Sequence, residues 1–403
     1  MSANTEALGT ETVQPKSLRL LQGLAKHILR GRLMLRLPDG SQQVFEGPEP
    51  GPSAELHVIR PRFVRRVLTG GSTGFAETYL DGDCDTLDLA AFLELAALNY
   101  DAWERIVDRK PVYRFALRLL HIMRPNTRRG AKRNIAKHYD LGNDFYRLWL
   151  DETMTYSSAV FDAPETSLNE AQHNKYRRIA QSAGLRPDGH VLEIGCGWGG
   201  FAEFAAREIG ARVTAVTISD AQFAYAKERI QRAGLNERVE IRRQDYRDID
   251  GTYDHIASIE MFEAVGERYW PVFFSKLRER LKPGGQAALQ VITIADEFFE
   301  QYRRSTDFIQ RHIFPGGMLP SPDVLKRQVR QAGLDVRQDN GFGLDYARTL
   351  ADWHRRFDAA WPQIATLGYD ERFARMWRYY LAYCKAGFLT GRIDVRQIAL
   401  THG

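Results

Sequence analysis

The stretch HVLEIGCGWGG, residues 190–200, constrains the fold more than any other part of this 403-residue sequence. Its apolar residues Val191, Leu192 and Ile194 predict a short, buried strand of a parallel sheet. The glycines that follow lead into FAEFAAREIG, which predicts a helix. Because glycine has no Cβ atom, such a turn allows a bulky ligand to approach the backbone. The stretch therefore predicts a ligand site at the carboxyl end of a strand.

Strands and helices continue to alternate downstream of this turn. The predicted strands are residues 211–219, 239–246, 253–262 and 286–294. Asp220 is the predicted N-cap of the helix after the first of these strands. The alternation is typical of an α/β fold with a doubly wound, mostly parallel sheet, in which ligands bind beyond the carboxyl ends of the strands. The features predicted to lie at that edge are the glycine turn, Ile218, Asp245, Tyr246 and Glu263.

The glycine pattern also fits G-x-G-x-x-G, so a dinucleotide site is an alternative. Asp220 lies roughly where an acidic residue binds the ribose of NAD, which favours this alternative. Against it, the sheet is predicted in mid-chain and no hydride-acceptor site is evident. Glu193, two residues before the first glycine, and the Asp245–Tyr246 pair resemble instead the S-adenosylmethionine site of class I methyltransferases. No metal site is predicted.

The part of the chain before residue 134 predicts a separate, smaller domain. Residues 1–17 predict a disordered tail, residues 18–103 a small α+β domain, and residues 134–403 the catalytic domain. The small domain has no catalytic constellation, so we expect a role in lipid interaction or as a scaffold. The sequence has no apolar run near the roughly 18 residues of a spanning helix. It also has no secretory signal and only three widely spaced cysteines, which favours the cytosol.

Residues 104–133 carry much of the positive charge. The whole chain has a formal net charge of +5, and this segment contains ten lysine and arginine residues against Glu104 and Asp108. Arginines interleaved with apolar residues predict a basic linker helix that lies on an anionic bilayer surface. One alternative is an interdomain helix with a solvated basic face. Another is a nucleic-acid site, but no nucleic-acid motif accompanies the charge, so no such partner is expected.

Aromatic residues are concentrated in residues 134–161 and in about the last hundred residues. Such residues are usually part of a packed core. The alternative is that they form the walls of a pocket for a long acyl chain, and ring faces attract a cation such as a sulfonium.

Nine motifs together carry a family resemblance. They are HYDLGNDFY, MTYSSAVF, VLEIGCGWGG, VTISDAQ, QDYRD, MFEAVGERYW, IFPGGMLPS, FGLDYARTLADWHRRF and YLAYCKAGF. In these motifs the chain resembles the cyclopropane-fatty-acyl-phospholipid synthases, and the resemblance extends from about residue 55 to the C-terminus. The resemblance implies a seven-stranded methyltransferase sheet, S-adenosylmethionine as methyl donor and the cis double bond of a phospholipid acyl chain as acceptor. It also suggests a homodimer, and with the basic helix a cytoplasmic protein peripheral at the inner membrane surface.

Carried over position by position, the resemblance implies a set of cofactor-binding residues. They are Tyr156, Ser157, Glu193, Gly195, Cys196, Gly197, Gly199, Thr217, Ile218, Gln222, Tyr246 and Arg247. The family also holds a bicarbonate ion with a glutamate, a histidine, a tyrosine and backbone amides. The matching catalytic positions here are Glu263, Gln290, Tyr346, Ser158 and Ile292, and Cys384 matches the cysteine described as the family's active-site residue.

Three positions depart from the family pattern. Gln290 replaces the histidine that binds bicarbonate, Ser158 replaces a cysteine, and Ala264 replaces a histidine. A glutamine can donate a hydrogen bond to an anion, but it cannot carry charge or move a proton as histidine does. Without the family, Cys384 is best explained as a buried small residue. Glu263 could cap the helix that follows, but its place at a strand end favours a functional role.

The reaction implied by the resemblance creates a carbocation, and a base must then remove a proton. Loss from the added methyl group closes a cyclopropane, whereas loss from a neighbouring chain carbon gives a methyl-branched alkene. We expect the cyclopropane, with the branched product as the alternative. A methyltransferase for a small polar acceptor and a non-catalytic lipid-binding homologue are further alternatives.

Overall fold

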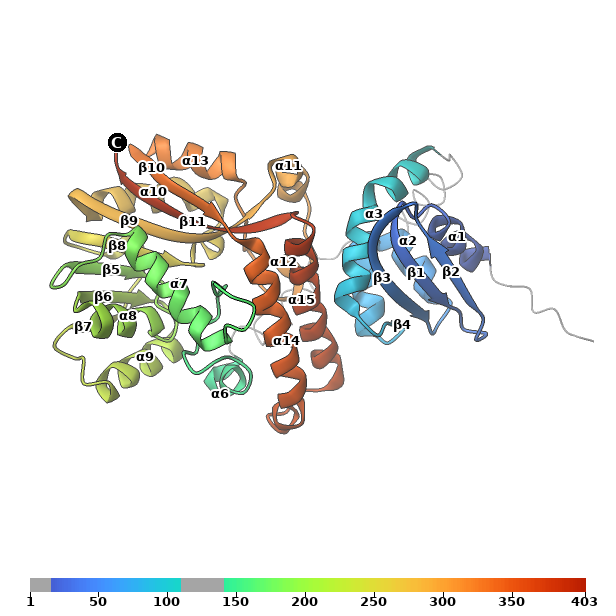
Figure 1. Cartoon of the computed structure of the whole chain (residues 1–403), viewed down its shortest axis with the longest axis horizontal. Coiled ribbons are helices and arrows are strands. Elements are labelled where there is room, and N and C mark those ends of the chain that lie inside the picture. Colours follow the sequence, from blue (N-terminus) through green and yellow to red (C-terminus); the bar gives the residue numbers. More distant parts are fainter. Residues whose placement is uncertain (1–15, 110–140) are drawn as a thin grey trace, which may run out of the picture. The chain divides into compact units, whose positions relative to one another are not determined.

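The computed structural model describes residues 16–109 and 141–403. The chain divides into two compact units, Met1–Asn126 and Thr127–Gly403 (Figure 1). The predicted tail lies outside the described residues up to residue 15, as does the basic segment from residue 110 onward. The same holds for residues 134–140 of the predicted catalytic domain.

The first unit is a four-stranded sheet packed with helices. Its elements are α1 Lys16–Ala25, β1 Arg30–Arg36, β2 Gln42–Glu46, β3 Glu49–Val58, α2 Arg62–Leu80, β4 Cys84–Asp85 and α3 Leu89–Arg109. The strand order is β2-β1-β3-β4, and β1 and β2 form the antiparallel hairpin. The inward residues Leu35, Leu56 and Leu95 are at most 2% exposed, so the sheet and α3 share a core. This unit is α+β, as the sequence predicts.

Two helices of this unit extend beyond the predicted boundaries. Helix α1 begins at Lys16, inside the predicted tail, and α3 continues to Arg109, inside the predicted linker. Asp83, which is fully buried, accepts hydrogen bonds from the guanidinium groups of Arg60, Arg62 and Arg66. These bonds explain how a buried carboxylate is tolerated here.

The second unit contains a seven-stranded sheet. Its strands are β5 His190–Ile194, β6 Arg212–Thr217, β7 Val239–Arg243, β8 Tyr253–Ile259, β9 Leu281–Ile294, β10 Leu334–Gly341 and β11 Ile393–His402. They lie in the order β10-β11-β9-β8-β5-β6-β7. Strands β5 to β9 pair in parallel, and only β11 pairs antiparallel, with β9 and β10. The predicted doubly wound, mostly parallel sheet is confirmed.

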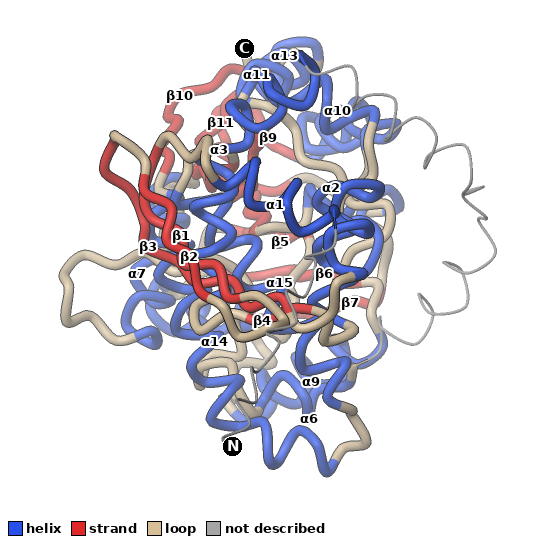
Figure 2. The backbone as a smooth tube through the Cα atoms, turned by 90° about the vertical axis from the view of Figure 1, so that its right-hand side faces the viewer, coloured by secondary structure: helices blue, strands red, loops and turns tan. Residues whose placement is uncertain are grey.

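Helices cover both faces of this sheet (Figures 1 and 2). The helices described in the second unit are α6 Gly142–Arg147, α7 Leu168–Ser182, α8 Gly200–Phe204, η1 Ala205–Ile209, α9 Asp220–Arg232, η2 Tyr246–Asp248, η3 Phe262–Ala264, η4 Glu267–Tyr269, α10 Trp270–Arg280, α11 Asp296–Arg304, α12 Phe308–His312, α13 Pro322–Gln331, α14 Gly343–Thr366 and α15 Glu371–Leu389. Val191 packs in one core with α7, α8 and α9, whereas Leu192 packs in the other with α10 and α13. Neighbouring strand residues face opposite sides, so a strand covered on both faces is apolar throughout.

The predicted N-cap at Asp220 is wrong. Ser219 is the N-cap of α9, because its hydroxyl accepts the backbone N–H of Gln222 at 3.3 Å. Asp220 is the first helical residue, and its carboxylate pairs with Arg243 at 2.7 Å.

The bounds of four predicted strands also differ from the structure. Strand β6 is Arg212–Thr217, whereas the sequence predicts residues 211–219. Strand β7 ends at Arg243, because Asp245 caps the short helix η2. Strand β8 ends at Ile259, because Glu260 turns into the left-handed region at φ +47°. Strand β9 begins at Leu281, before the predicted start at residue 286.

Candidate active site

The glycine turn after β5 leaves room at the carboxyl edge of the sheet. Gly195 has φ +83°, and a Cβ atom there would lie 2.5 Å from the Cγ atom of Met261. Gly197 has φ +52°, and a Cβ atom there would meet no described atom within 4 Å. Position 195 therefore requires glycine for both conformation and packing, and the turn borders open space at position 197.

A cavity of about 440 Å³ opens at this edge, at the ends of β5, β6 and β8 and just after the end of β7. Its volume is that of a pocket for a small-molecule ligand. Its lining includes all the predicted cofactor residues except Gly199: Tyr156, Ser157, Glu193, Gly195, Cys196, Gly197, Thr217, Ile218, Gln222, Tyr246 and Arg247. Gly199 is the N-cap of α8, where a Cβ atom would lie 3.1 Å from the Cβ atom of Ala226. Gly199 thus permits close helix packing instead of forming the cavity wall.

The wall formed at β6 and after β7 combines an apolar surface with polar groups. Ile218 is 75% exposed although it is apolar, and it lines the cavity. The Thr217 hydroxyl donates to Gln222 Oε1 at 2.9 Å. Arg247 forms two hydrogen bonds with the carboxylate of Asp245, at 2.9 and 2.6 Å. An exposed aliphatic side chain beside hydroxyl and amide groups suits a ligand with a flat ring and a sugar.

Two buried ionisable residues, Glu193 and Lys175, lie close to this cavity. Glu193 lines it, is 2% exposed, and its Oε2 atom has no hydrogen-bond partner among the described residues. Burial raises the pKa of Glu193 to about 8. Lys175 on α7 is fully buried and donates to Ser157 Oγ at 2.7 Å, and burial lowers its pKa to about 7. A buried, unpartnered carboxylate oxygen in a cavity wall indicates a ligand that supplies the donor.

Three of the predicted catalytic residues converge on Glu260, which no sequence motif singled out. Its Oε1 atom accepts the backbone N–H of Ser158 at 2.8 Å and the side-chain Nε2–H of Gln290 at 2.7 Å. Its Oε2 atom accepts the hydroxyl of Tyr346 at 2.6 Å. Glu260 also lines the cavity. Its φ of +47° is unusual for a residue with a side chain, and such strain is concentrated at functional sites.

Glu263 and Ile292 pair with each other instead of contacting Glu260. The backbone N–H of Ile292 donates to Glu263 Oε1 at 2.5 Å, and Glu263 Oε2 is buried without a partner among the described residues. Burial, followed by the nearby charge of Glu260, raises the pKa of Glu263 to about 8. Burial also raises the pKa of Glu260, but the hydrogen bonds from Tyr346 and Gln290 oppose this shift. Of the two carboxyl groups, Glu263 is therefore the one that keeps its proton at neutral pH.

Aromatic side chains form a ring cluster beside the cavity. Tyr156 belongs to both, since it lines the cavity and its ring centre lies 5.2 Å from that of Trp353. Its hydroxyl donates to the hydroxyl of Tyr380 at 2.6 Å. The cluster also includes Phe145, Tyr146, Trp149 and Trp377. Cys384 on α15 is half-buried, and burial raises the pKa of its thiol, which favours the protonated form.

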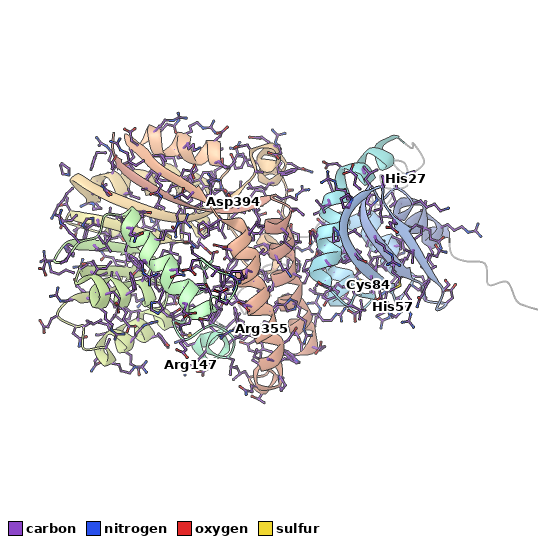
Figure 3. All side chains as sticks on the ribbon, in the orientation of Figure 1. His27, His57, Cys84, Arg147, Arg355 and Asp394 are labelled. Atoms are coloured by element: carbon purple, nitrogen blue, oxygen red, sulfur yellow. The ribbon has the colours of Figure 1, made fainter. Side chains whose placement is uncertain are left out.

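Helix α14, which carries Tyr346, is fixed at its start by β11. Asp394 of β11, labelled in Figure 3, accepts the backbone N–H of Gly343 at 2.8 Å. One turn after Tyr346, the hydroxyl of Thr349 accepts the backbone N–H of Ala159 at 3.1 Å. The segment that presents the Ser158 N–H and the helix that presents the Tyr346 hydroxyl are thus held together.

The comparison with known families agrees with this geometry. The model of the mycolic acid cyclopropane synthetase family matches residues 126–398. The chain belongs to this family. It is 40% identical over 402 residues to the tuberculostearic acid methyltransferase UfaA1 of Mycobacterium tuberculosis, covering 95% of this chain and 90% of that protein. It is 37% identical over 361 residues to the cyclopropane-fatty-acyl-phospholipid synthase of Escherichia coli, covering 87% and 88%.

Solved structures show the same family fold. The mycolic acid cyclopropane synthase CmaA1, complexed with SAH and CTAB, superposes with a TM-score of 0.62 at 31% identity, covering 66% of this chain and 97% of that chain. As a member of the cyclopropane synthetase family, the chain is an enzyme of the methyltransferase class. The family resemblance predicted from the motifs is confirmed. The NAD alternative is not supported, because Asp220 is not among the residues that line the cavity.

Proposed function

We propose that this enzyme uses S-adenosylmethionine to methylate the cis double bond of a phospholipid-bound, unsaturated fatty acyl chain. One observation carries the proposal: a single cavity is bordered by the glycine turn, by the ring cluster at Tyr156 and by the hydrogen-bonded carboxylate of Glu260. The names of relatives at 40% and 37% identity, which act on fatty acids or fatty-acyl phospholipids, support it. So does the SAH bound in the structure of CmaA1.

The cavity residues suit the chemistry of a charged nucleoside donor. When bound, S-adenosylmethionine supplies an electrophilic methyl group on a sulfonium. Ile218 offers an apolar surface for a flat base, and Thr217 and Gln222 offer hydrogen bonds for a ribose. Glu193 offers the unpartnered carboxylate oxygen for a donor group of the ligand. Tyr156 lines the cavity, and the π electrons of its ring would attract the positively charged sulfonium.

The ring cluster suits an apolar acceptor. An alkene is a weak nucleophile, so it must be held in alignment with the methyl group and away from water. Aromatic walls exclude water and also stabilise the carbocation that forms when the alkene is methylated. A small polar acceptor would gain nothing from such walls, which argues against that alternative.

Two products remain candidates, and each has an observation that favours it. The cyclopropane is the product named in the Escherichia coli relative and the one expected from the motifs. The methyl-branched product is favoured by the relative named for tuberculostearic acid and by Gln290, which replaces the expected histidine close to the proton-accepting position. We place the cyclopropane first, because the motif resemblance extends over most of the chain.

The deciding experiment incubates the full chain with S-adenosylmethionine carrying a labelled methyl group and with vesicles of monounsaturated phosphatidylglycerol. We expect label in the lipid, and none with vesicles of saturated phosphatidylglycerol. Mass spectrometry with chain fragmentation then separates a ring from a branch. A folded chain that binds SAH by calorimetry and transfers no label would contradict catalysis on this acceptor and favour the lipid-binding alternative.

We also propose that the enzyme works at an anionic membrane surface, through the basic segment 104–133. The support is its sequence, with ten basic residues interleaved with apolar ones. Among residues 16–109 and 141–403, no helix has the length and apolarity needed to cross a bilayer. A homodimer, suggested by the resemblance, is part of the same proposal.

A further inference from the structure

We propose that the carboxylate of Glu260 occupies, as part of the protein, the place that the family resemblance assigns to bicarbonate, and that Glu260 accepts the proton that ends the reaction. The inference rests on the proposed function for its chemical step. Its structural part concerns only which anion the donors of this site hold.

The donors expected for bicarbonate are all in use. The single N–H of Ser158 and one side-chain N–H of Gln290 bond to Glu260 Oε1, and the other N–H of Gln290 lies 3.2 Å from the carbonyl oxygen of Ser158. The single O–H of Tyr346 bonds to Glu260 Oε2. The remaining donor, the N–H of Ile292, bonds to Glu263. Each of these groups has no further hydrogen to donate, so none is left for a second anion.

Charge also disfavours a bicarbonate ion beside Glu260. Two anions that share one buried site repel each other, so one of them must take up a proton or leave. Lys175 is the cation that most directly offsets the charge of Glu260, and it also offsets Glu193 and Asp151. The residues present here therefore do not fit bicarbonate in addition to Glu260.

The replacement of histidine by Gln290 fits this arrangement. Gln290 Oε1 accepts the side-chain Nε2–H of Gln397 at 2.9 Å, which orients the amide so that its Nε2 faces Glu260. A neutral amide can hold a fixed carboxylate without exchanging a proton with it. The backbone of Glu260 at φ +47° is strained, and this conformation places its carboxylate among the three donors and in the cavity wall.

In the chemical step, the cation formed on the methylated acyl chain loses one C–H proton to Glu260. The electron pair of that C–H bond closes the new carbon–carbon bond of the ring, or forms the double bond of the branched product. The carboxylate becomes a carboxylic acid, which later gives its proton to water. No further reactant is required, and charge is conserved.

The test compares Glu260→Gly, Glu260→Gln and wild type in buffers stripped of carbon dioxide. Glycine accepts φ +47° without strain and leaves a gap of carboxylate size, whereas glutamine fills the site without a basic oxygen. We expect wild-type label transfer to be unaffected by bicarbonate, and both variants to lose about 10²–10⁴-fold in kcat. Bicarbonate or formate should restore Glu260→Gly in a saturable way and leave Glu260→Gln inactive. Glu279→Gln on the exposed side of α10 is the matched control and should retain activity.

A binding measurement makes the inference independent of turnover. Carbon-13 NMR of labelled bicarbonate should show binding to Glu260→Gly and none to wild type, with calorimetric SAH binding as the measure of folding. Wild-type activity that requires bicarbonate, bicarbonate bound to wild type, or full activity of Glu260→Gln would each overturn the inference. If wild type transfers no label to lipid, the proposed function fails, while the NMR comparison still decides which anion fills the site.

Discussion

At the scale of single residues, Glu263 is a carboxyl group that folding removes from water. Burial, and then the charge of Glu260, raises its pKa from 4.5 to about 8. The folded chain therefore retains a proton that the unfolded chain releases above pH 4.5, so this group lowers the free energy of unfolding as pH rises between these values. The loss ends near pH 8, where both states are ionised.

We therefore expect Glu263→Gln to be more stable than wild type at pH 7 by on the order of 1–3 kcal/mol, and equal to it near pH 4. Glutamine keeps an oxygen for the N–H of Ile292 and has no charge to desolvate. Urea unfolding at a series of pH values measures this difference. The pKa of Glu193 is also raised to about 8. Because Glu193 is present in both proteins, its contribution to the pH dependence of stability cancels in the difference. If the difference in free energy of unfolding between the two proteins were the same at every pH, the expectation would be contradicted.

Lys175 is the second residue whose charge can be tested. Burial raises the pKa of Glu260, and the hydrogen bonds from Tyr346, Gln290 and Ser158 oppose this shift, as does the positive charge of Lys175. Lys175→Met should therefore raise the pKa of Glu260 and move the acid limb of the rate profile for label transfer to higher pH. Tyr346 and Glu263, the other titratable groups facing Glu260, are unchanged in this variant.

The control for this change is a lysine outside the site. Lys276 on α10 pairs with Glu279, so Lys276→Met should leave the acid limb in place. If the acid limb of the pH–rate profile were unchanged in Lys175→Met, the charge of Lys175 would have no effect on the pKa of Glu260. Calorimetric SAH binding to each variant confirms that the cavity is intact.

At the scale of elements, adding one methyl group to the turn after β5 is destabilising for two reasons, backbone conformation and packing. In Gly195→Ala the backbone must adopt φ +83°, and the added Cβ atom must displace the side chain of Met261. Gly234→Ala on the turn after α9 has the first cost only, because φ is +69° and no described atom lies within 4 Å. We expect Gly234→Ala to lose about 1 kcal/mol of stability, and Gly195→Ala to lose more and also bind SAH less tightly. Urea unfolding and calorimetry measure both, and equal losses would contradict the packing argument.

The elements show which parts of the molecule follow from local sequence. The strand at Val191 and Leu192, the glycine turn and the alternation of strands and helices are local patterns, so their prediction from the sequence is confirmed. The N-cap was misplaced by one residue, because Ser219 and Asp220 are both favourable caps and only the geometry of the turn selects the first. Glu260 was missed for a different reason. Its partners lie up to 102 residues away in the chain, on a loop, a strand and a helix, and only the folded unit brings them together.

At the scale of the whole molecule, the catalytic unit and the small unit are joined by a segment that is rich in positive charge. The catalytic unit contains the cavity and the ring cluster, so it carries the proposed chemistry. If the acceptor is the proposed phospholipid acyl chain, the enzyme needs a way to stay at the bilayer surface while that chain enters the site. We propose residues 104–133 for this purpose, because arginine and lysine attract anionic head groups and apolar residues between them favour insertion into the interface.

This role predicts binding that depends on both lipid charge and salt. The full chain should co-sediment with phosphatidylglycerol vesicles and bind phosphatidylcholine vesicles much less. It should dissociate from the anionic vesicles as salt is raised from about 0.01 to about 1 M, because the screening length shortens from about 30 to about 3 Å. A variant with Arg114, Arg118 and Arg124 changed to glutamine should lose about 1 kcal/mol of binding per residue. Its label transfer to acyl chains dispersed in detergent should equal that of wild type, since the cavity is unaltered. Co-sedimentation that does not depend on lipid charge or salt would show that the segment has no electrostatic role at the membrane. If the variant lost label transfer equally on vesicles and in detergent, the role of the segment would lie in the catalytic unit instead.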